Sequence, residues 1–458
     1  MRKSLIIILI TAIFLSCPPA EETEPEQTEQ TDPVSVFVPA DFAGMCHAGY
    51  SDNLDREFEM LDELGAIWVH WDFSWSSIQP AEDTWNFSTF DARVKRNNAE
   101  GKKIIGMLLY QSNWIHDKYD YPRERRIRED QIPYFVNYAV ETVKRYNGKP
   151  GSEGFVDAWF IWNEPDLQPR FWTGTKEEFF ALNKATAKAI RELDVAEGTQ
   201  TVLVGGVFTA LVTDDWITGL FNQGGMLEYK VDGLGFHPYS VTPVGAAGIF
   251  NVFKSKVARY GYADKIWVNE MGYPTYSDIN FNPVGSGRYG TDQWEGDMPE
   301  VVVKTFALLA AAGAKNLTWY HLFDSRSERR DGDSEDWFGL VWRRGAGDWV
   351  IKGGYWGFAV AANNIPGKTY KENNFLTGSS LTNIQSCYFE GSDGKHTLVF
   401  WNNSPLRTVD VTVTLEGSNF KLWNVETGES VDASATATHT LHPVNTHQKT
   451  LVFLTWEE

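Results

Sequence analysis

Two hydrophobic patterns divide the chain into two folded regions. Between residues 41 and 368, short runs that are apolar at successive positions alternate with amphipathic stretches. Strands that are apolar on both faces are typical of buried parallel sheets. Eight regularly spaced runs therefore predict an α/β fold, a closed (β/α)8 or TIM barrel, with an open doubly wound sheet as the competing architecture. The runs lie at residues 42–47, 66–73, 104–110, 157–163, 202–207, 231–237, 266–271 and 317–323.

Helix signals occupy the stretches between these runs. Residues 175–178, Thr-Lys-Glu-Glu, form a capping box, and apolar residues follow it at helical spacing. A second helix is expected to begin near Asp297, with Pro299 in its first turn, and to end at Gly313. These signals support a helix after each buried strand.

The pattern changes after residue 368. Residues 369–458 alternate between apolar and polar positions and are divided by Gly, Asn, Asp and Ser. This period of two predicts a C-terminal antiparallel β-sandwich. The clearest predicted strands lie at residues 396–403, 409–415, 420–425 and 449–455.

The first 40 residues predict export and attachment to a membrane. Residues 1–17 have a basic start, an apolar run and the ending Leu-Ser-Cys, which resembles the lipoprotein box of bacteria. Cys17 would then carry lipid and anchor the protein outside the cytoplasm, and Pro18 favours the outer membrane or cell surface. An ordinary secreted protein is the alternative. Residues 18–40 begin with a stretch rich in Pro, Glu and Thr and predict an extended acidic tether.

Composition narrows the set of partners. Lys and Arg number 41 against 61 Asp and Glu, a formal net charge of −20. This charge argues against a nucleic-acid partner and against docking of the protein surface on anionic lipid. Apart from Cys17, the cysteines are Cys46 and Cys387, which we expect to be buried free thiols. No spacing of ligands indicates a metal or another cofactor, and the oligomeric state stays open.

Two glutamates mark the ends of predicted strands. The fourth run ends in Trp-Asn-Glu-Pro-Asp (162–166), and the seventh ends in Asn-Glu-Met-Gly (269–272). A charged side chain at the end of a buried strand is costly unless it faces a solvated pocket or a partner. Strands four and seven lie across the mouth of such a barrel, so Glu164 and Glu270 would converge there. Glycoside hydrolysis requires two such carboxylates.

At this point the chain resembles the clan A glycoside hydrolases, and most of all family 39, which holds β-xylosidases and α-L-iduronidases. The resemblance is carried by IWNEPD (161–166), RFWTGTKEEF (170–179), HWDFSWSSIQP (70–80), WNF (85–87), GFHPY (235–239), WYHLFD (319–324) and FGL (338–340). It covers about residues 41–365 and implies a carbohydrate substrate.

The resemblance also implies a role for each matching residue. Glu164 would be the general acid/base and Glu270 the nucleophile, with the pKa of Glu164 raised and Glu270 ionised. Asn163 would bind the hydroxyl beside the reacting carbon. Tyr239 would hold the Glu270 carboxylate, and His237 would shape the pocket beside it.

Aromatic residues are abundant, with 19 tryptophans, and flat rings often stack on sugars. We consider Trp71, Trp75, Trp114, Trp172 and Trp319 for this role and prefer Trp114 and Trp172.

The chain departs from the family in two places. Gln79 stands where an acid is frequent, and His321 where Trp is frequent, so His321 is a candidate for altering the sugar subsite. Arg326, Arg329 and Arg330 follow the last strand within a mixed-charge loop. If that loop rims the cleft, these arginines could meet acidic sugars such as uronates.

Together these features predict a lipid-anchored retaining glycoside hydrolase that acts on plant-type or other polysaccharides or oligosaccharides. A β-xylosidase-like exo-β-glycosidase is favoured. An endo-β-glycanase of the same clan, cellulase- or mannanase-like, is the alternative, and an inactive surface glycan-binding lipoprotein is the third possibility.

Overall fold

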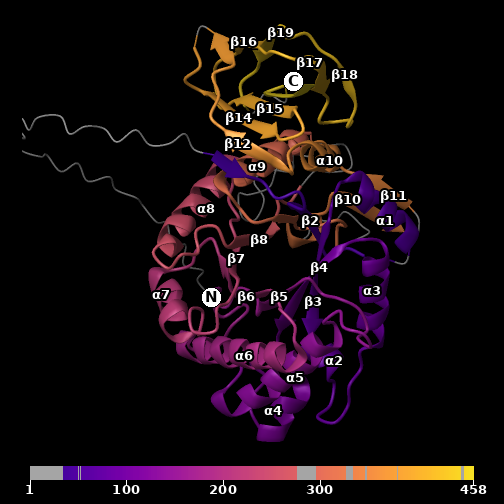
Figure 1. Cartoon of the computed structure of the whole chain (residues 1–458), viewed down its shortest axis with the longest axis vertical. Helices are drawn as coiled ribbons and strands as arrows, with labels where there is room; N and C mark the ends of the chain where they lie inside the picture. Colours follow the sequence, from indigo (N-terminus) through magenta and orange to yellow (C-terminus); the bar gives the residue numbers. More distant parts are fainter. Residues whose placement is uncertain are drawn as a thin grey trace, which may run out of the picture. The chain divides into compact units, whose positions relative to one another are not determined.

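Eight parallel strands close into a barrel (Figure 1). In this computed structural model, residues 35–49, 51, 53–275, 296–325, 334–345, 348–378, 380–444 and 448–458 are described. The predicted signal peptide (1–17), the lipidation residue Cys17 and the tether up to residue 34 lie outside them, as do Arg326, Arg329 and Arg330.

All eight predicted runs contribute a strand of the barrel. The first strand pairs in parallel with the eighth, with Ala43 opposite Leu317, and this pairing closes the ring. The predicted closed barrel is therefore confirmed, and the open doubly wound sheet is wrong. The strands are β2 (Ala43–Cys46), β3 (Trp68–Ser74), β4 (Lys103–Leu109), β5 (Ala158–Ile161), β6 (Leu203–Thr209), β7 (Gly233–His237), β8 (Ile266–Met271) and β9 (Leu317–Trp319).

The inside of the barrel is filled near the amino-terminal ends of its strands. The rings of Trp68 and Trp267 meet edge to face with centroids 5.3 Å apart. Ile105 and Phe160 pack in the same apolar cluster and are fully buried. The space for a ligand is therefore confined to the carboxyl-terminal mouth, as is usual for this fold.

Helices surround the strands, and Figure 1 shows α3, α6, α7 and α8 around the barrel. The two expected helix boundaries are confirmed. Thr175 and Glu178 form the capping box of α6, and α9 has Pro299 in its first turn and ends before Gly313, whose φ of 86° suits glycine. The helices that follow the eight strands in turn are α1 (Leu54–Glu63), α3 (Ser88–Ala99), α5 (Ile132–Arg145), α6 (Lys176–Glu197), α7 (Asp214–Gln223), α8 (Pro243–Ala258), α9 (Met298–Ala312) and α10 (Gly354–Asn364).

Shorter elements extend the loops at the mouth. They are α2 (Trp75–Ile78), α4 (Asn113–Tyr119) and the 3-10 turn η1 (Glu129–Gln131) after β3 and β4, and η2 (Ser334–Trp337), β10 (Val341–Gly345) and β11 (Asp348–Ile351) after β9.

The C-terminal residues form two antiparallel sheets, as the period of two predicts. A seven-stranded sheet has the order β1-β12-β14-β15-β20-β17-β18, and a three-stranded sheet has the order β13-β16-β19. Their strands are β1 (Ser35–Phe37), β12 (Lys368–Lys371), β13 (Leu376–Gly378), β14 (Ile384–Gly391), β15 (Lys395–Asn402), β16 (Val409–Thr414), β17 (Ser418–Trp423), β18 (Ser430–Asp432), β19 (Thr436–Leu441) and β20 (Leu451–Glu457).

The central strand β15 of the larger sheet is buried on both faces. Leu398 and Phe400 of β15 pack in a cluster with Val411 and Val413 of the smaller sheet. Their neighbour Val399 belongs instead to the main cluster of the barrel and its helices. Successive strand residues point to opposite faces, so the sheet joins the sandwich core to the barrel.

Residues at both predicted limits of the sandwich differ from our expectation. Ser35–Phe37, which we assigned to the tether, form β1 and pair with β12. The boundary that we set after residue 368 cuts β12, which begins at Lys368. The alternation of only three or four residues is too short to be read as a strand until its partner is known.

Cys46 and Cys387 are buried free thiols, as expected. Within the described residues, no helix combines the length and the apolar character needed to cross a membrane.

Candidate active site

A cavity of about 770 Å³ opens at the carboxyl-terminal mouth of the barrel. This volume lies within the range of ligand-binding pockets, roughly 300–1,000 Å³. Every strand of the barrel contributes a residue near its carboxyl-terminal end or in the loop that follows, so the wall depends on the closed ring. These residues are His47, Asp72, Tyr110, Glu164, Thr209, Tyr239, Glu270 and Tyr320.

Glu164 and Glu270 converge in this cavity. Glu270 lies within β8, and Glu164 follows β5 in a turn where Trp162 and Glu164 have φ angles of 64° and 43°. Left-handed backbone at residues other than glycine is sparsely populated and is frequent at functional sites. The turn directs the Glu164 carboxylate into the mouth. One oxygen of each carboxylate and a ring nitrogen of His237 all lie within 4.8 Å of one another.

The two carboxylates have different hydrogen-bond partners. His237 Nδ1 lies 2.7 Å from Glu164 Oε1, and the Tyr239 hydroxyl donates to Glu270 Oε1 at 2.7 Å. His237 Nδ1 is also 3.9 Å from Glu270 Oε1. Both partners come from the end of β7, so this strand spaces the two glutamates and gives them unlike surroundings.

Burial sets the electrostatics of the pair. It raises the pKa of Glu270, as does the charge of Glu164, while His237 and the Tyr239 hydrogen bond oppose the rise. Burial alone would lower the pKa of His237, but Glu270 and Glu164 raise that pKa above its usual value. From the sequence we expected a raised pKa for Glu164 and an ionised Glu270. In the structure Glu270 is itself desolvated, and its ionised form depends on His237 and Tyr239.

Replacement of Tyr239 by phenylalanine tests this dependence. The variant removes a hydrogen bond that favours the Glu270 carboxylate, so the pKa of Glu270 should rise further. If Glu270 acts as a nucleophile, the acidic limb of the kcat/KM profile should move to higher pH. Hydrogen bonds to charged groups contribute about 1.5–3 kcal/mol, so below that limb activity should fall roughly 10-fold or more. The pH dependence of kcat/KM measures the shift.

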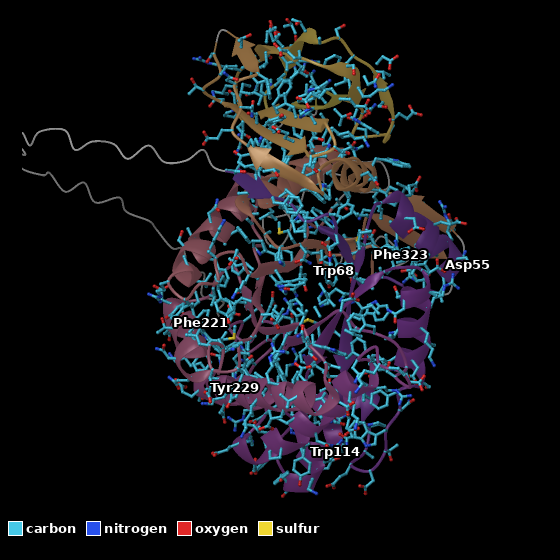
Figure 2. The ribbon with its side chains drawn as sticks, viewed as in Figure 1. Asp55, Trp68, Trp114, Phe221, Tyr229 and Phe323 are labelled. Atoms are coloured by element: carbon cyan, nitrogen blue, oxygen red, sulfur yellow. The ribbon has the colours of Figure 1, made fainter. Side chains whose placement is uncertain are left out.

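Tyr229→Phe is the matched control, because Tyr229, labelled in Figure 2, lies in the loop between α7 and β7 and outside the cavity lining. An acidic limb at the same pH in Tyr239→Phe and the parent protein would contradict the role of this hydroxyl.

Two further residues that we predicted for the site, Asn163 and His237, lie beside Glu164 and Glu270. Asn163 precedes Glu164 and lines the cavity. His237 is fully buried and contacts Glu164 rather than the open cavity. Its position therefore fits the orientation of a carboxylate better than contact with a sugar.

Two of the tryptophans that we considered for stacking on a sugar, the preferred Trp172 and the further candidate Trp319, do not reach the cavity. Trp172 and Trp319 are fully buried, so neither presents a face to a ligand. Trp172 packs edge to face on Trp162, and Trp319 packs against Tyr273 and Phe358.

Trp114, labelled in Figure 2, lies in α4. Its indole nitrogen donates a hydrogen bond to the Gln79 carbonyl. It lies outside the cavity lining, as do Trp71 and Trp75, which are buried in the core. The loops after the strands contain two kinds of aromatic residue, those that pack against the outer helices and those that line the cavity. Position in the sequence does not distinguish the two kinds.

His321 and Gln79 are also buried. His321 is 6% exposed and its ring lies 6.1 Å from that of His47, one shell behind the cavity wall. Gln79 accepts a hydrogen bond from the Trp75 indole, so it organises the loop after β3. Neither departure from the family pattern reaches the cavity directly.

Several residues of the cavity wall were not predicted from the sequence, namely His47, Asp72, Tyr110 and Phe171. Asp72 could have been found, because it is two residues after the inward-facing His70 on the same strand. His47 and Tyr110 also end strands but carry no formal charge that would draw attention to them.

Glu164, His237 and Glu270 could also surround a metal ion, since each offers a ligand atom within the same small space. His237 Nδ1 is, however, in direct hydrogen-bond contact with Glu164, and a metal bound between them would have to replace this bond. The hydrogen bonds in place give the two carboxylates two different protein partners, His237 for Glu164 and Tyr239 for Glu270.

The chain has a closed parallel barrel with two glutamates at the ends of its fourth and seventh strands, which is the arrangement found in clan A glycoside hydrolases. Comparisons with known proteins agree with this class. Residues 131–266, less than a third of the chain, match the model of glycosyl hydrolases family 39. The matched segment includes Glu164 and ends before Glu270.

A curated relative, a β-xylosidase of Caldicellulosiruptor saccharolyticus, is 38% identical over 101 residues, which are 22% of this chain and 19% of the relative. The alignment thus spans about a fifth of that enzyme. The chain is therefore related to family 39 through part of its length.

Solved structures show that the fold extends over nearly the whole chain. A family 39 glycoside hydrolase of Bacteroides cellulosilyticus WH2 aligns with a TM-score of 0.68 and 18% identity, over 92% of this chain and 81% of its own. A monomeric β-xylosidase of Caulobacter crescentus CB15 aligns with a TM-score of 0.59 and 13% identity, over 92% of this chain and 97% of its own. At these identities the likeness establishes the fold.

Proposed function

We propose that the chain is a retaining glycoside hydrolase that cleaves O-glycosidic bonds by double displacement, with exo-β-glycosidase action of the β-xylosidase type. The observation that carries this proposal is the approach of the Glu164 and Glu270 carboxylates to within 4.8 Å. Retaining enzymes hold their carboxyl groups about 5–5.5 Å apart, whereas inverting enzymes need about 6.5–9.5 Å to admit a water.

In the proposed reaction Glu270 attacks the anomeric carbon while Glu164 gives its proton to the departing oxygen. The bond from the anomeric carbon to the leaving group breaks as the bond to Glu270 forms. Glu164, now ionised, takes a proton from water, and that water displaces Glu270 from the anomeric carbon. Two inversions give net retention. Asn163, which lines the cavity beside Glu164, would bind the neighbouring hydroxyl.

The division of roles is supported by the partners of each glutamate. Glu270 accepts a hydrogen bond from a phenol, which favours the ionised form that a nucleophile needs. Glu164 contacts His237, an ionisable ring that can exchange a proton with a group whose protonation changes during the cycle.

Exo action is supported by the cavity wall. An endo-acting enzyme of this fold would be expected to bind several sugars along an open groove, often on exposed tryptophans. Among the described residues, none that lines the cavity is a tryptophan. The endo-β-glycanase stays the alternative. The presence of both glutamates in one cavity supports an enzyme over an inactive glycan-binding lipoprotein.

We also propose that the enzyme works outside the cytoplasm, attached to a bacterial outer membrane or cell surface by lipid on Cys17. The basic, apolar and Leu-Ser-Cys segments of residues 1–17 support this location.

One experiment tests both proposals. The full chain and its Cys17→Ser variant are produced in a bacterial host, and fractions are assayed with aryl β-xylosides, glucosides, galactosides, mannosides and uronides. Hydrolysis of at least one substrate is expected in the membrane fraction of the parent and in the soluble fraction of the variant. Proton NMR of the first product should show the β-anomer. An α-anomer as first product would refute double displacement, and activity that stays soluble in the parent would refute the anchor.

A further inference from the structure

Asp72 is a carboxylate of the cavity for which the proposed reaction has no task. It lies near the end of β3 and lines the cavity, so a ligand can reach its side chain, although the surrounding walls remove much of the bulk solvent from it. Within the described chain, Asp72 forms no hydrogen bond or ion pair. Both oxygens of the Asp72 carboxylate are therefore available to accept hydrogen bonds from a ligand in the cavity.

His47 is the neighbour of Asp72 on this wall. It directly follows β2, lines the cavity and is in ring contact with Tyr320 at 5.6 Å. Its ring nitrogens have no hydrogen-bond partner among the described residues. Burial raises the pKa of the Asp72 carboxyl, and His47 lies close enough to oppose part of that rise. The pair thus offers a strong acceptor beside a group that can donate or accept.

The position of the pair around the barrel decides what it can touch. Around the barrel the strands follow the order β2-β3-β4-β5-β6-β7-β8-β9. The wall from β5 to β8, which includes His237 and Tyr239, therefore forms one side of the mouth. Asp72 and His47 come from the opposite side. A sugar with its anomeric carbon between Glu164 and Glu270 would turn its remaining ring atoms toward that free side.

Charge limits the sugar that this wall accepts. Asp72, Glu164 and Glu270 place three carboxylates in one cavity. Arg170, the guanidinium on the lining, is exposed and stacks 5.0 Å above the Phe171 ring on the loop after β5. A carboxylate on the bound sugar would meet Asp72 as a like charge at close range, which is costly in a desolvated site. Hydroxyl groups would instead donate to it.

We infer that Asp72, with His47 beside it, is the specificity residue that binds hydroxyl groups of a neutral sugar at the cleaved position and excludes uronic acids there. This inference rests on the proposed function and narrows its substrate class. The possibility of acidic sugars, raised by Arg326, Arg329 and Arg330, concerns residues outside the described part of the chain.

The first test compares an aryl β-glucoside with the matching β-glucuronide, or an active neutral glycoside with its C5 carboxylate counterpart. The parent should favour the neutral sugar in kcat/KM by about 100-fold or more. Asp72→Asn keeps the shape and removes the charge, so kcat/KM for the neutral sugar should fall roughly 10- to 100-fold. The preference for the neutral sugar should fall at least 10-fold. Asp214→Asn, an exposed surface change on α7, is the control.

The second test uses deoxy substrates in a double-mutant cycle with Asp72→Ala. Removal of the hydroxyl that Asp72 binds should lower kcat/KM in the parent and change it little in the variant. Equal losses in both proteins for every hydroxyl would overturn the inference, as would a parent that prefers the uronide.

Failure of this inference can be distinguished from failure of the proposed function. A 2-deoxy-2-fluoro glycoside should label Glu270 in both the parent and Asp72→Asn, as mass spectrometry of the peptide would show. Labelling in both with an unchanged sugar preference would refute the role of Asp72 and leave the reaction intact. No labelling of Glu270 in the parent would refute the reaction and, with it, the inference.

Discussion

Glu270→Ala is expected to lower kcat on an aryl glycoside by about five orders of magnitude, as removal of a nucleophile does in enzymes that act through a covalent intermediate. The variant lacks the oxygen that would attack the anomeric carbon, and the remaining donors and binding contacts supply only residual catalysis. Stopped assays with a released phenol measure the loss. Glu192→Ala, on the exposed face of α6, is the control and should keep full activity.

Azide gives this prediction a chemical signature. In Glu270→Ala, azide can occupy the space of the lost carboxylate and displace the leaving group directly, while Glu164 still donates its proton. The product should be the α-glycosyl azide, the inverted form. A variant with parental kcat, or a rescued product of β-configuration, would show that Glu270 is not the nucleophile.

Glu164→Ala is expected to have the second-largest effect, and its size should depend on the leaving group. General acid catalysis contributes about 10²–10⁴-fold, so substrates with poor leaving groups should lose that much in kcat/KM. A dinitrophenyl glycoside needs no proton for departure and should keep most of its kcat/KM. Its kcat should fall because the second step then lacks its general base. A series of aryl glycosides with graded phenol pKa values measures this dependence.

Azide again separates the two roles. In Glu164→Ala, azide would attack the glycosyl intermediate on Glu270, and the product should be the β-glycosyl azide, with retained configuration. The same loss of kcat/KM for every leaving group would mean that Glu164 positions the substrate instead of giving a proton. The opposite azide products of the two variants identify the two carboxylates independently.

The barrel could be predicted from sequence because its signal is local. A strand buried on both faces must be apolar at nearly every position, and runs such as 104–110 show this directly. Helix boundaries could be predicted equally well, because the capping box at Thr175 and the helix end at Gly313 depend on residues within one turn of the helix. The short strand β1 was missed because three residues of a tether acquire their structure from pairing with β12.

The convergence of Glu164 and Glu270 could be expected for the same reason. Each follows or ends a buried strand, and parallel strands of a closed barrel all end at one rim. The contacts from Tyr239 and His237 came from the resemblance to family 39, and the structure shows which atoms meet. It assigns His237 to Glu164, whereas the sequence analysis assigned it only to the pocket.

The aromatic residues show where this reasoning fails. Trp172 and Trp319 stand in loops or strand ends of the right face, yet both are fully buried. A tryptophan can fill the space behind the wall or form the wall itself, and its neighbours in sequence are similar in the two cases. The outcome depends on packing across several loops at once.

The sequence by itself determined the order of strands and helices, the period of the C-terminal sheets and the presence of two acids at one rim, because each depends on residues adjacent along the chain. Only the tertiary structure decided which side chains form the cavity, how closely the two glutamates approach, and that Asp72 faces open space without a partner. These features depend on the stagger of eight strands and on the packing of their loops. A local sequence pattern does not encode the distances between residues that are far apart along the chain.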